Sequence, residues 1–453
     1  MKNNILDATN GPILKPLIAF SVPIMLANIL QLLFNAADIV VIGQFVDETA
    51  VAAVGSTGFI INILVSLFTG LSIGATVVMS TELGSGNTKL HKVIHTTYTL
   101  GVILGIFTAI VGLFISPFLL ELLGTPEDII GQANTYLKIF FLGQPGFMIY
   151  TFARAILVAK GDTKSPFRYL LFSGIVNVAL NVFLVTVVHL GVAGVAIATI
   201  VSQYLSAILT VRKLTKTHGV FHLKPTEFSM DRGELKKIVR LGLPTGLQST
   251  LISVSGLLTQ SSFNSLGTAV VAGQSASGNI MAFVALSLNA FSQGCMTFTG
   301  QNFGSKQMDR VKRTYRCTLL INGLLGLVLG TAVIVFGESL LRIYTPNSEA
   351  SVMAGKIGLI ATMAFAPLMG LQDASGFVLR GMNQSAFPTI TALFGNCVFR
   401  IFWVIAVFNR FAPNMETLRA CRLLVSAYPI SWVLIMGANT VAYLLFMKKY
   451  TKN

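Results

Sequence analysis

Two acidic side chains lie inside long apolar stretches of this chain, Asp38 and Asp373. Asp38 follows Gln31 and Asn35 at spacings of seven and three residues, so the three side chains would share one helix face. A carboxylate in hydrocarbon costs about 3 kcal/mol on insertion scales, so it needs a partner, a cavity or a function. A polar stripe can serve only to hold helices together, but we favour a functional role because the pKa of such a carboxylate is tunable across neutral pH.

A second polar group follows along the chain. Asn177 and Asn181 are spaced four apart, and Thr199 comes shortly after a stretch rich in Gly and Ala. Small residues allow helices to pack closely, so these positions are equally compatible with packing alone. Together with Asp38, however, they would supply the oxygen ligands that an alkali cation or a proton-linked network needs.

The later acidic residue has different neighbours. Asp373 stands beside Gln372, and Arg400 lies one apolar stretch further on. A structural ion pair between Asp373 and Arg400 and a second coupling carboxylate are both possible readings. Pro23 and Pro244 each remove a backbone hydrogen bond from an apolar helix, which would bend it near a cavity, so we predict gating kinks there.

Only 11% of the 453 residues are charged, against about 25% in soluble domains, so an integral membrane protein is indicated. The four cysteines have no paired spacing, so neither a disulfide framework nor a zinc site is expected. The pairs His91/His95 and His218/His222 lack a third ligand and are read as solvated faces, so we predict no metal site beyond possible sodium. No Walker phosphate loop occurs, which argues against ATP hydrolysis.

A bilayer is crossed by about 20 mainly apolar residues, and twelve stretches of the chain meet this length. The predicted spans are 14–44, 51–80, 93–118, 129–157, 167–188, 191–211, 239–264, 268–299, 316–341, 353–379, 388–409 and 420–447. The termini and even-numbered loops hold 24 of the 32 Lys and Arg residues, against 5 in the opposite loops. Because basic residues stay on the cytoplasmic side, both termini are expected there, and the net charge of +15 is a topology signal.

The two halves of the chain repeat one another. Pro23 matches Pro244 at an offset of 221 residues, and the interval Pro145–Pro166 recurs as Pro367–Pro388. Since six spans separate equivalent points, the halves should have the same orientation. We therefore predict an all-α polytopic membrane protein of two pseudo-symmetric six-helix lobes, with an N-lobe (1–212), a basic cytoplasmic linker (213–238) and a C-lobe (239–453).

Several short motifs resemble the multidrug and toxic compound extrusion (MATE) transporters, in particular their DinF-like branch. They are Asp38 in the first span, the loop Gly161–Pro166 with Asn177 after it, Ala198-Thr199, Gly300–Gly304 and Leu379-Arg380-Gly381. The resemblance implies two lobes around a central cavity, alternating access, and export driven by sodium or proton entry. It also implies that Asp38, Asn177 and Thr199 belong to the cation site, and that Asp373 matches an aspartate of NorM-like members.

The chain departs from the family pattern at two positions. Asn181 replaces an aspartate of the DinF-like branch, so the first-lobe site keeps one carboxylate and the coupling ion stays open between sodium and proton. NorM-like members carry a glutamate in the seventh span, whereas here Gln248 is the nearest polar candidate to accompany Asp373.

The leading hypothesis is an ion-coupled antiporter, not an enzyme, that exports amphipathic and often cationic compounds. The coupling ion and the substrate would compete for the Asp38 face, with Gln31, Phe34, Asn35 and Gln372 lining the substrate cavity. We expect a multi-pass protein of a bacterial-type plasma membrane that works as a monomer, with no cofactor and no nucleic-acid partner. The rival hypotheses are a metabolite exporter or lipid-linked-precursor flippase of the same superfamily, and a channel or permease subunit that needs a separate ATPase.

Overall fold

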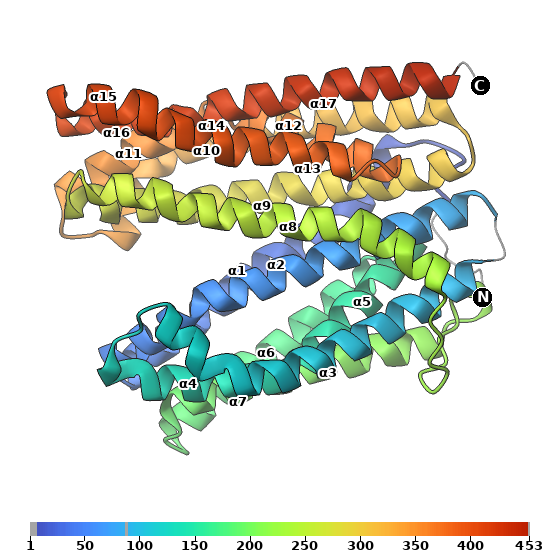
Figure 1. Ribbon diagram of the computed structural model, residues 1–453, viewed down its shortest axis with the longest axis horizontal. Coiled ribbons are helices and arrows are strands. Elements are labelled where there is room, and N and C mark those ends of the chain that lie inside the picture. Colours follow the sequence, from blue (N-terminus) through green and yellow to red (C-terminus); the bar gives the residue numbers. More distant parts are fainter. Residues whose placement is uncertain (1–6, 87–88, 452–453) are drawn as a thin grey trace. The chain divides into compact units, whose positions relative to one another are not determined.

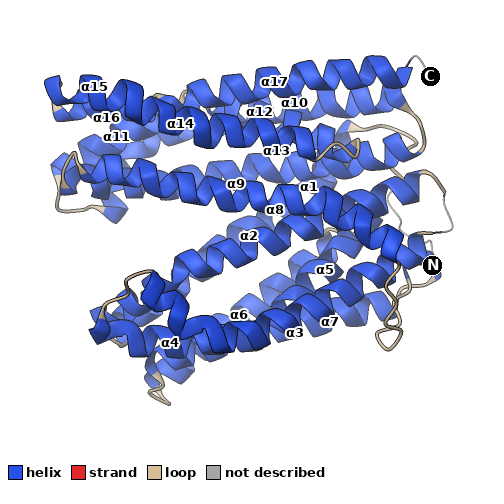
Figure 2. Ribbon diagram, in the orientation of Figure 1, coloured by secondary structure: helices blue, strands red, loops and turns tan. Residues whose placement is uncertain are grey.

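The computed structural model describes residues 7–86 and 89–451, without the side chains of Val254, Leu257, Leu258 and Thr451. Long helices dominate this part of the chain (Figure 1), and it contains no β-strand (Figure 2). Within it, nine helices are long and apolar enough to cross a membrane, and two bent helix pairs raise the number to eleven. The remaining long helix, α8 (Arg232–Asn264), has 33 residues and a more polar composition. The predicted all-α, multi-span fold is confirmed.

The helices follow the predicted spans closely. In the first half they are α1 (Leu14–Phe45), α2 (Glu48–Gly84), α3 (Leu90–Leu122), α4 (Glu127–Leu142), α5 (Gln144–Lys160), α6 (Lys164–Thr186), α7 (Gly191–Thr215) and the short η1 (Gly219–Phe221). After α8 come α9 (Thr268–Gly304), α10 (Met308–Tyr344), α11 (Glu349–Met363), α12 (Ala366–Gly381), α13 (Ala386–Leu393), η2 (Phe394–Val398), α14 (Phe399–Phe402), η3 (Trp403–Phe408), α15 (Asn409–Phe411), η4 (Ala412–Asn414), α16 (Thr417–Val425) and α17 (Ala427–Thr451).

The chain forms two compact units, and two helices are divided between them. Unit 1 is built mainly from Leu26–Gly246, and unit 2 from Ala8–Met25 and everything from Leu247 onward. The division crosses α1 two residues after Pro23 and α8 two residues after Pro244. The first part of α1 therefore packs with unit 2, whereas the first part of α8 packs with unit 1.

Two predicted spans are bent at matching positions. The span 129–157 is the pair α4 and α5, which meet at 46°, and the span 353–379 is the pair α11 and α12, which meet at 50°. In both pairs a proline, Pro145 or Pro367, occupies the first turn of the second helix. Proline lacks the N–H that would continue the preceding helix, and its ring favours a new helix start. The repeat found in the sequence therefore includes these two bends.

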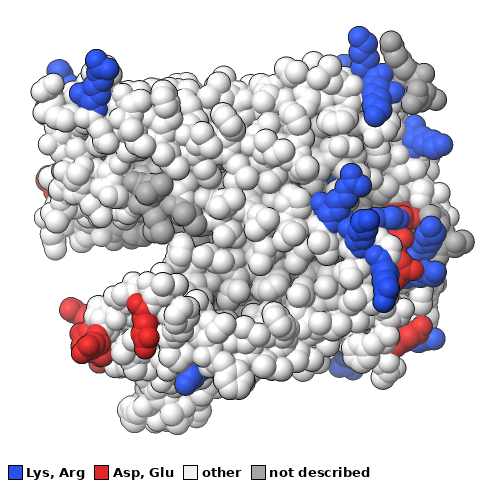
Figure 3. Space-filling view, in the orientation of Figure 1, with Lys and Arg blue, Asp and Glu red and all other residues white. Residues whose placement is uncertain are grey.

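The outer surface of each unit suits a bilayer. On α3, Phe107, Phe114 and Phe118 are more than half exposed, and α10 presents Leu324, Val328 and further large apolar side chains. On the face seen in Figure 3, the charged side chains gather at the helix ends and the long middle portions carry almost none. Large exposed apolar side chains are what lipid chains, not water, would cover.

Close backbone contact joins α8 to α2 within unit 1. A Cβ atom added to Gly74 would lie 2.6 Å from the Cα of Gly242 and 2.6 Å from the carbonyl oxygen of Ile238. No side chain larger than hydrogen fits at that position without a backbone shift. Small residues at such crossings let membrane helices gain van der Waals contact, which is what holds them together when lipid is as apolar as the interface.

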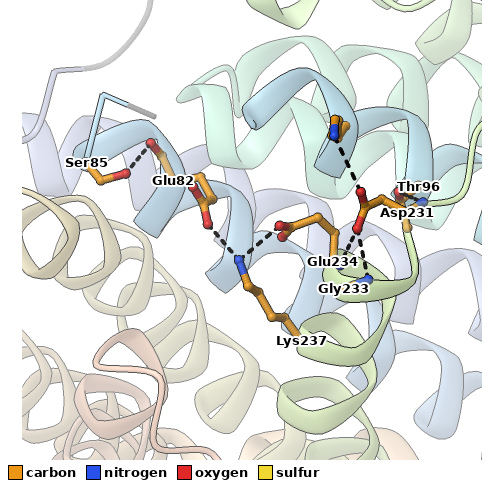
Figure 4. Close-up of polar contacts among 8 residues, drawn as sticks. Glu82, Ser85, Thr96, Asp231, Gly233, Glu234 and Lys237 are labelled. Atoms are coloured by element: carbon orange, nitrogen blue, oxygen red, sulfur yellow. Dashed lines mark hydrogen bonds and ion pairs between the residues drawn. The ribbon is translucent and has the colours of Figure 1, made fainter. Parts of the chain in front are cut away.

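A charged cluster holds the same two helices at one end (Figure 4). Lys237 Nζ lies 3.0 Å from Glu82 Oε1 of α2 and 3.0 Å from Glu234 Oε1 of its own helix. Asp231 accepts hydrogen bonds from the N–H groups of Glu234 and Gly233, which cap the start of α8 and hold the pKa of Asp231 below its ordinary value. The linker thus ends in a cap that is tied to unit 1.

The N-terminal segment is held in unit 2 by a motif that the sequence analysis assigned only by resemblance. The backbone N–H of Ala8 donates to Gln301 Oε1 at 2.9 Å, and Asn302 Nδ2 donates to the Ala8 carbonyl at 3.2 Å. Arg310 of α10 donates to the same carbonyl at 2.7 Å. Gln301 and Asn302 therefore anchor the chain just before α1 begins.

Candidate functional site

Asp38 lies in α1 among neutral polar side chains of α6 and α7, all within unit 1. Asn181 Nδ2 donates a hydrogen bond to Asp38 Oδ1, and the hydroxyl of Thr199 lies 3.4 Å from Asp38 Oδ2. All of the described side chains that contact this carboxylate are uncharged. The carboxylate is half-buried, whereas Asn181 is fully buried. A charge of this kind, without a basic partner, is open to neutralisation by a bound cation or proton.

Asn177 completes the cluster. Asn181 Nδ2 also donates to Asn177 Oδ1 at 3.4 Å, and Asn177 Nδ2 donates to Thr199 Oγ1 at 3.5 Å. Thr199 lies 3.0 Å from the carbonyl of Val195 as well, so its single proton can serve either that carbonyl or Asp38. Asn181 Oδ1 is buried without a hydrogen-bond partner. The structure therefore brings all four residues proposed from the sequence into one cluster.

The residues predicted to line the substrate cavity have mixed environments. Gln31 and Asn35 are exposed on α1, on the same helix face as Asp38. Phe34 is half-buried, and its ring packs so closely on α6 that any side chain at Gly174 would overlap it. Phe34 thus supports the contact between α1 and α6, while Gln31 and Asn35 are free to meet a ligand.

Unit 2 contains a second polar cluster around Asp373 on α12. Asn289 Nδ2 of α9 donates to Asp373 Oδ2 at 3.2 Å, and Gln293 Nε2 donates to Asn289 Oδ1 at 2.9 Å. Asn289 and Gln293 were not among the residues predicted from the sequence. Their spacing of four on one helix was the available signal, the same one that identified Asn177 and Asn181.

Gln248 has a different partner from the one expected. Its Oε1 accepts a hydrogen bond of 2.7 Å from Arg380 Nη2, and Arg380 also lies over the ring of Phe377. Arg380 and Asp373 are seven residues apart on α12, so they share a face, and they attract one another electrostatically. Gln372 is half-buried, with an Oε1 atom that has no hydrogen-bond partner.

Arg400 on α14 does not pair with Asp373 in this structure. Its Nη2 donates to Asn396 Oδ1 at 2.7 Å and to Ser431 Oγ at 3.2 Å, and the guanidinium lies 4.2 Å from the ring centre of Tyr428. The charge neighbour of Asp373 is Arg380. Sequence spacing alone could not test the pair of Asp373 and Arg400 because it depends on how α12 and α14 pack.

The interpretation of the histidine pair on α3 as a solvated face is wrong for His95, which is buried against the linker. The rings of His91 and His95 lie 4.3 Å apart, and His95 Nδ1 lies 3.0 Å from the carbonyl oxygen of Glu227. Within residues 7–86 and 89–451, no three His, Cys, Asp or Glu side chains come together as metal ligands do. The Asp38 cluster presents carboxylate, amide and hydroxyl oxygens, the types of atom that bind alkali cations and protons.

A protein-family model matches the chain in two segments. The model described as MatE matches residues 23–183 and again residues 244–405. The chain belongs to the MatE family. The two matches begin at Pro23 and Pro244, in agreement with the internal repeat. Members of this family are membrane transporters and not enzymes, so the chain is a transporter.

Named relatives cover most of this MatE chain. "Probable multidrug resistance protein YpnP" of Bacillus subtilis (strain 168) is 31% identical over 407 residues, which are 88% of either chain. "Multidrug export protein MepA" of Staphylococcus aureus (strain NCTC 8325 / PS 47) is 25% identical over 380 residues, 83% of this chain and 82% of its own.

Solved MATE structures share the fold over nearly the whole length. An outward-facing multidrug resistance MATE transporter of the MOP superfamily has a TM-score of 0.91, with 18% identity and 99% of each chain covered. A MATE protein in complex with MaL6 has a TM-score of 0.90, with 20% identity and coverage of 99% of this chain and 100% of its own. At these identities the likeness establishes the fold.

Proposed function

We propose that this MatE transporter is an antiporter that exports amphipathic, often cationic organic compounds in exchange for sodium or protons. The observation that carries the proposal is the environment of Asp38. Among the described residues, its carboxylate contacts only neutral hydrogen-bond donors. The names of the relatives, multidrug resistance and multidrug export proteins, support the substrate class. The excess of basic residues in alternate loops supports a plasma-membrane orientation with both termini in the cytoplasm.

The coupling step is competition for one negative charge. A cation or proton at Asp38 neutralises the carboxylate, which removes its attraction for a cationic substrate. It also frees the donors of Asn181 and Thr199 to change partners. Substrate and ion thus weaken one another's binding at the same group, and this reciprocal coupling links their movements in opposite directions.

The proposed gates are the proline positions of α1 and α8, where each helix would bend. Each helix passes from one compact unit to the other two residues after its proline, Pro23 or Pro244. Asp38 lies about four turns beyond Pro23 on the same helix. A change of bend at Pro23 would therefore connect ion binding in unit 1 with the part of α1 that packs in unit 2. We therefore propose that alternating access uses bending at these two hinges.

The test is efflux of ethidium or tetraphenylphosphonium from proteoliposomes under separately imposed sodium and pH gradients. One of the two gradients should drive efflux by the unmodified protein. Asp38→Asn keeps the shape of the side chain but removes the charge, so gradient-driven efflux should fall to the level of empty liposomes. Asp309→Asn is the matched control, because that carboxylate is 87% exposed on the surface, and it should leave efflux unchanged. Efflux at the normal rate from the Asp38→Asn protein would rule the mechanism out.

A further inference from the structure

Arg400 stands near the middle of the apolar stretch 386–414 without an acidic partner. The acceptors of its Nε and Nη2 groups are neutral oxygens of Ser431 and Asn396, and its flat face is covered by Tyr428. By contrast, the buried Arg380 has the carboxylate of Asp373 as its charge neighbour. An external anion gains the most binding free energy at a cation in hydrocarbon that has no counter-ion in the protein.

The guanidinium has a donor left for such an anion. A guanidinium carries five N–H groups, and those of Nη1 form no hydrogen bond with the residues that the structure describes. Arg400 itself is half-buried, while Asn396 and Ser431 are buried. The neutral contacts thus fix the position and orientation of the charge and leave its remaining edge accessible.

The helix around Arg400 is adapted to this position. Two π-helical segments, η2 and η3, flank α14, and π-helical turns inside α-helices are frequent at functional sites. Ser255 of α8 donates a hydrogen bond of 2.9 Å to the carbonyl of Asn396 within η2. The widened turn is therefore stabilised from a neighbouring helix, and it presents Asn396 and Arg400, spaced four apart, on one face.

The surroundings suit the apolar chain of an amphiphile. Phe394, Val398 and Phe402 are at least half exposed on the other side of the same helix, and Leu434 of α17 is 50% exposed. Exposed apolar side chains thus lie on the same short stretch of helix as the half-buried guanidinium, where they can contact the chain of an amphiphile. Carboxylate and phosphate groups are the anions whose oxygen geometry an arginine matches best.

We propose that Arg400, with Asn396, Ser431 and Tyr428, forms a site in unit 2 for the carboxylate or phosphate head of an amphipathic anion. This site is independent of the ion-coupling cluster at Asp38, which lies in unit 1. It gives the transporter a means of binding anionic or zwitterionic amphiphiles in addition to cationic ones. The anionic head can come from a free amphiphile or from a membrane lipid.

The chain provides its own reporters for a binding test. Its two tryptophans are Trp403, three residues after Arg400, and Trp432, directly after Ser431. Intrinsic fluorescence of the full-length protein in phosphatidylcholine nanodiscs is titrated with dodecanoate, dodecyl phosphate and dodecyltrimethylammonium, which share one chain length. We expect the two anions to bind about tenfold more tightly than the cation, the effect of one charge-assisted hydrogen bond.

Variants assign the effect to Arg400. Arg400→Gln should abolish the preference for anions, whereas Arg400→Lys should retain part of it. Arg410→Gln, which removes a cation at the exposed end of the same stretch, should leave it intact. Equal binding of anions and cation by the unmodified protein, or an unchanged preference in Arg400→Gln, would overturn the proposal. Because the readout is binding and not export, failure of the antiport mechanism would leave this result interpretable.

A second arm identifies the source of the anion. The dodecanoate titration is repeated in nanodiscs that contain phosphatidate. If phosphatidate removes the response to dodecanoate, the site binds a membrane lipid. If the response persists, the site takes free amphiphiles and contributes to substrate selection. Both results require a functioning Arg400 site, so they support the proposal and separate its two forms.

Discussion

At the scale of single residues, the chemistry of this transporter depends on how each intramembrane charge is compensated. Asp38 is contacted by neutral donors, Asp373 is contacted by Asn289 and attracted by the charge of Arg380, and Arg400 is contacted by neutral oxygens and an aromatic ring. Only a charge that the protein leaves unbalanced can be balanced by a transported ion or ligand. Asp38 meets this condition as a negative charge, and Arg400 meets it as a positive charge.

Asn181 provides a direct test of what sets the choice of ion. Asn181→Asp would place a second carboxylate next to Asp38, which increases the attraction for sodium over that of a single charge. The sodium concentration for half-maximal stimulation of efflux should fall by about tenfold, a net gain of about 1.4 kcal/mol. Efflux from proteoliposomes at fixed pH and increasing sodium measures this.

The control for that substitution is Asn35→Asp. Asn35 lies on the same face of α1 but is exposed, so the new charge is screened. It should change the sodium dependence much less than Asn181→Asp. An identical shift in both variants would mean that general negative charge, and not the geometry at Asp38, controls sodium binding.

At the scale of helices, the position of α8 is fixed by contacts of two kinds. Gly74 and Gly242 let the backbones of α2 and α8 approach closely, and Lys237 joins Glu82 to Glu234 at one end. The cation is shared by two carboxylates that are almost fully buried. These contacts hold the first part of α8 in unit 1 and leave the part after Pro244 to unit 2.

Gly74→Ala tests this helix contact. The added methyl group would meet the backbone of Gly242 at 2.6 Å, so α2 and α8 must separate. We expect a loss of about 1 to 3 kcal/mol of stability, the usual cost of overpacking, seen as a lower Tm in detergent. Gly58→Ala in the same helix is the matched control, because its added Cβ has no neighbour within 4 Å. A Tm for Gly74→Ala equal to that of the control would show that the contact does not bear on stability.

At the scale of the whole molecule, the repeat determines the architecture. The family model matches twice, starting at Pro23 and at Pro244, and both bent spans carry a proline at equivalent positions. An even number of spans places both termini on one side of the membrane. The distribution of Lys and Arg predicts that this side is the cytoplasm.

Reporter fusions in a bacterial host test that orientation. A green fluorescent protein fused after the last residue should fluoresce, and alkaline phosphatase at the same point should be inactive, because the phosphatase needs the oxidising exterior. Phosphatase fused after Asn347, between α10 and α11, should be active. Active phosphatase at the C-terminus would reverse the predicted topology.

The sequence alone predicted the all-α multi-span fold, the repeat and the four members of the Asp38 cluster. The fold is confirmed and the four residues lie together, because apolar length, helix periodicity and the cost of buried charge are properties of local sequence; the role of the cluster stays a prediction. Asn289 and Gln293 carried the same local signal, and they were identified only when the structure placed them beside Asp373.

Only the tertiary structure decided which residues are partners across helices. It paired Gln248 with Arg380, placed Arg400 beside Ser431 and Tyr428, and divided α1 and α8 between the two units. These outcomes depend on which helix faces meet, and the hydrophobic pattern of a membrane helix distinguishes its faces poorly because lipid and protein interior are equally apolar. The sequence therefore determined where charges enter the membrane, and the packing of the helices determined which of them remain uncompensated.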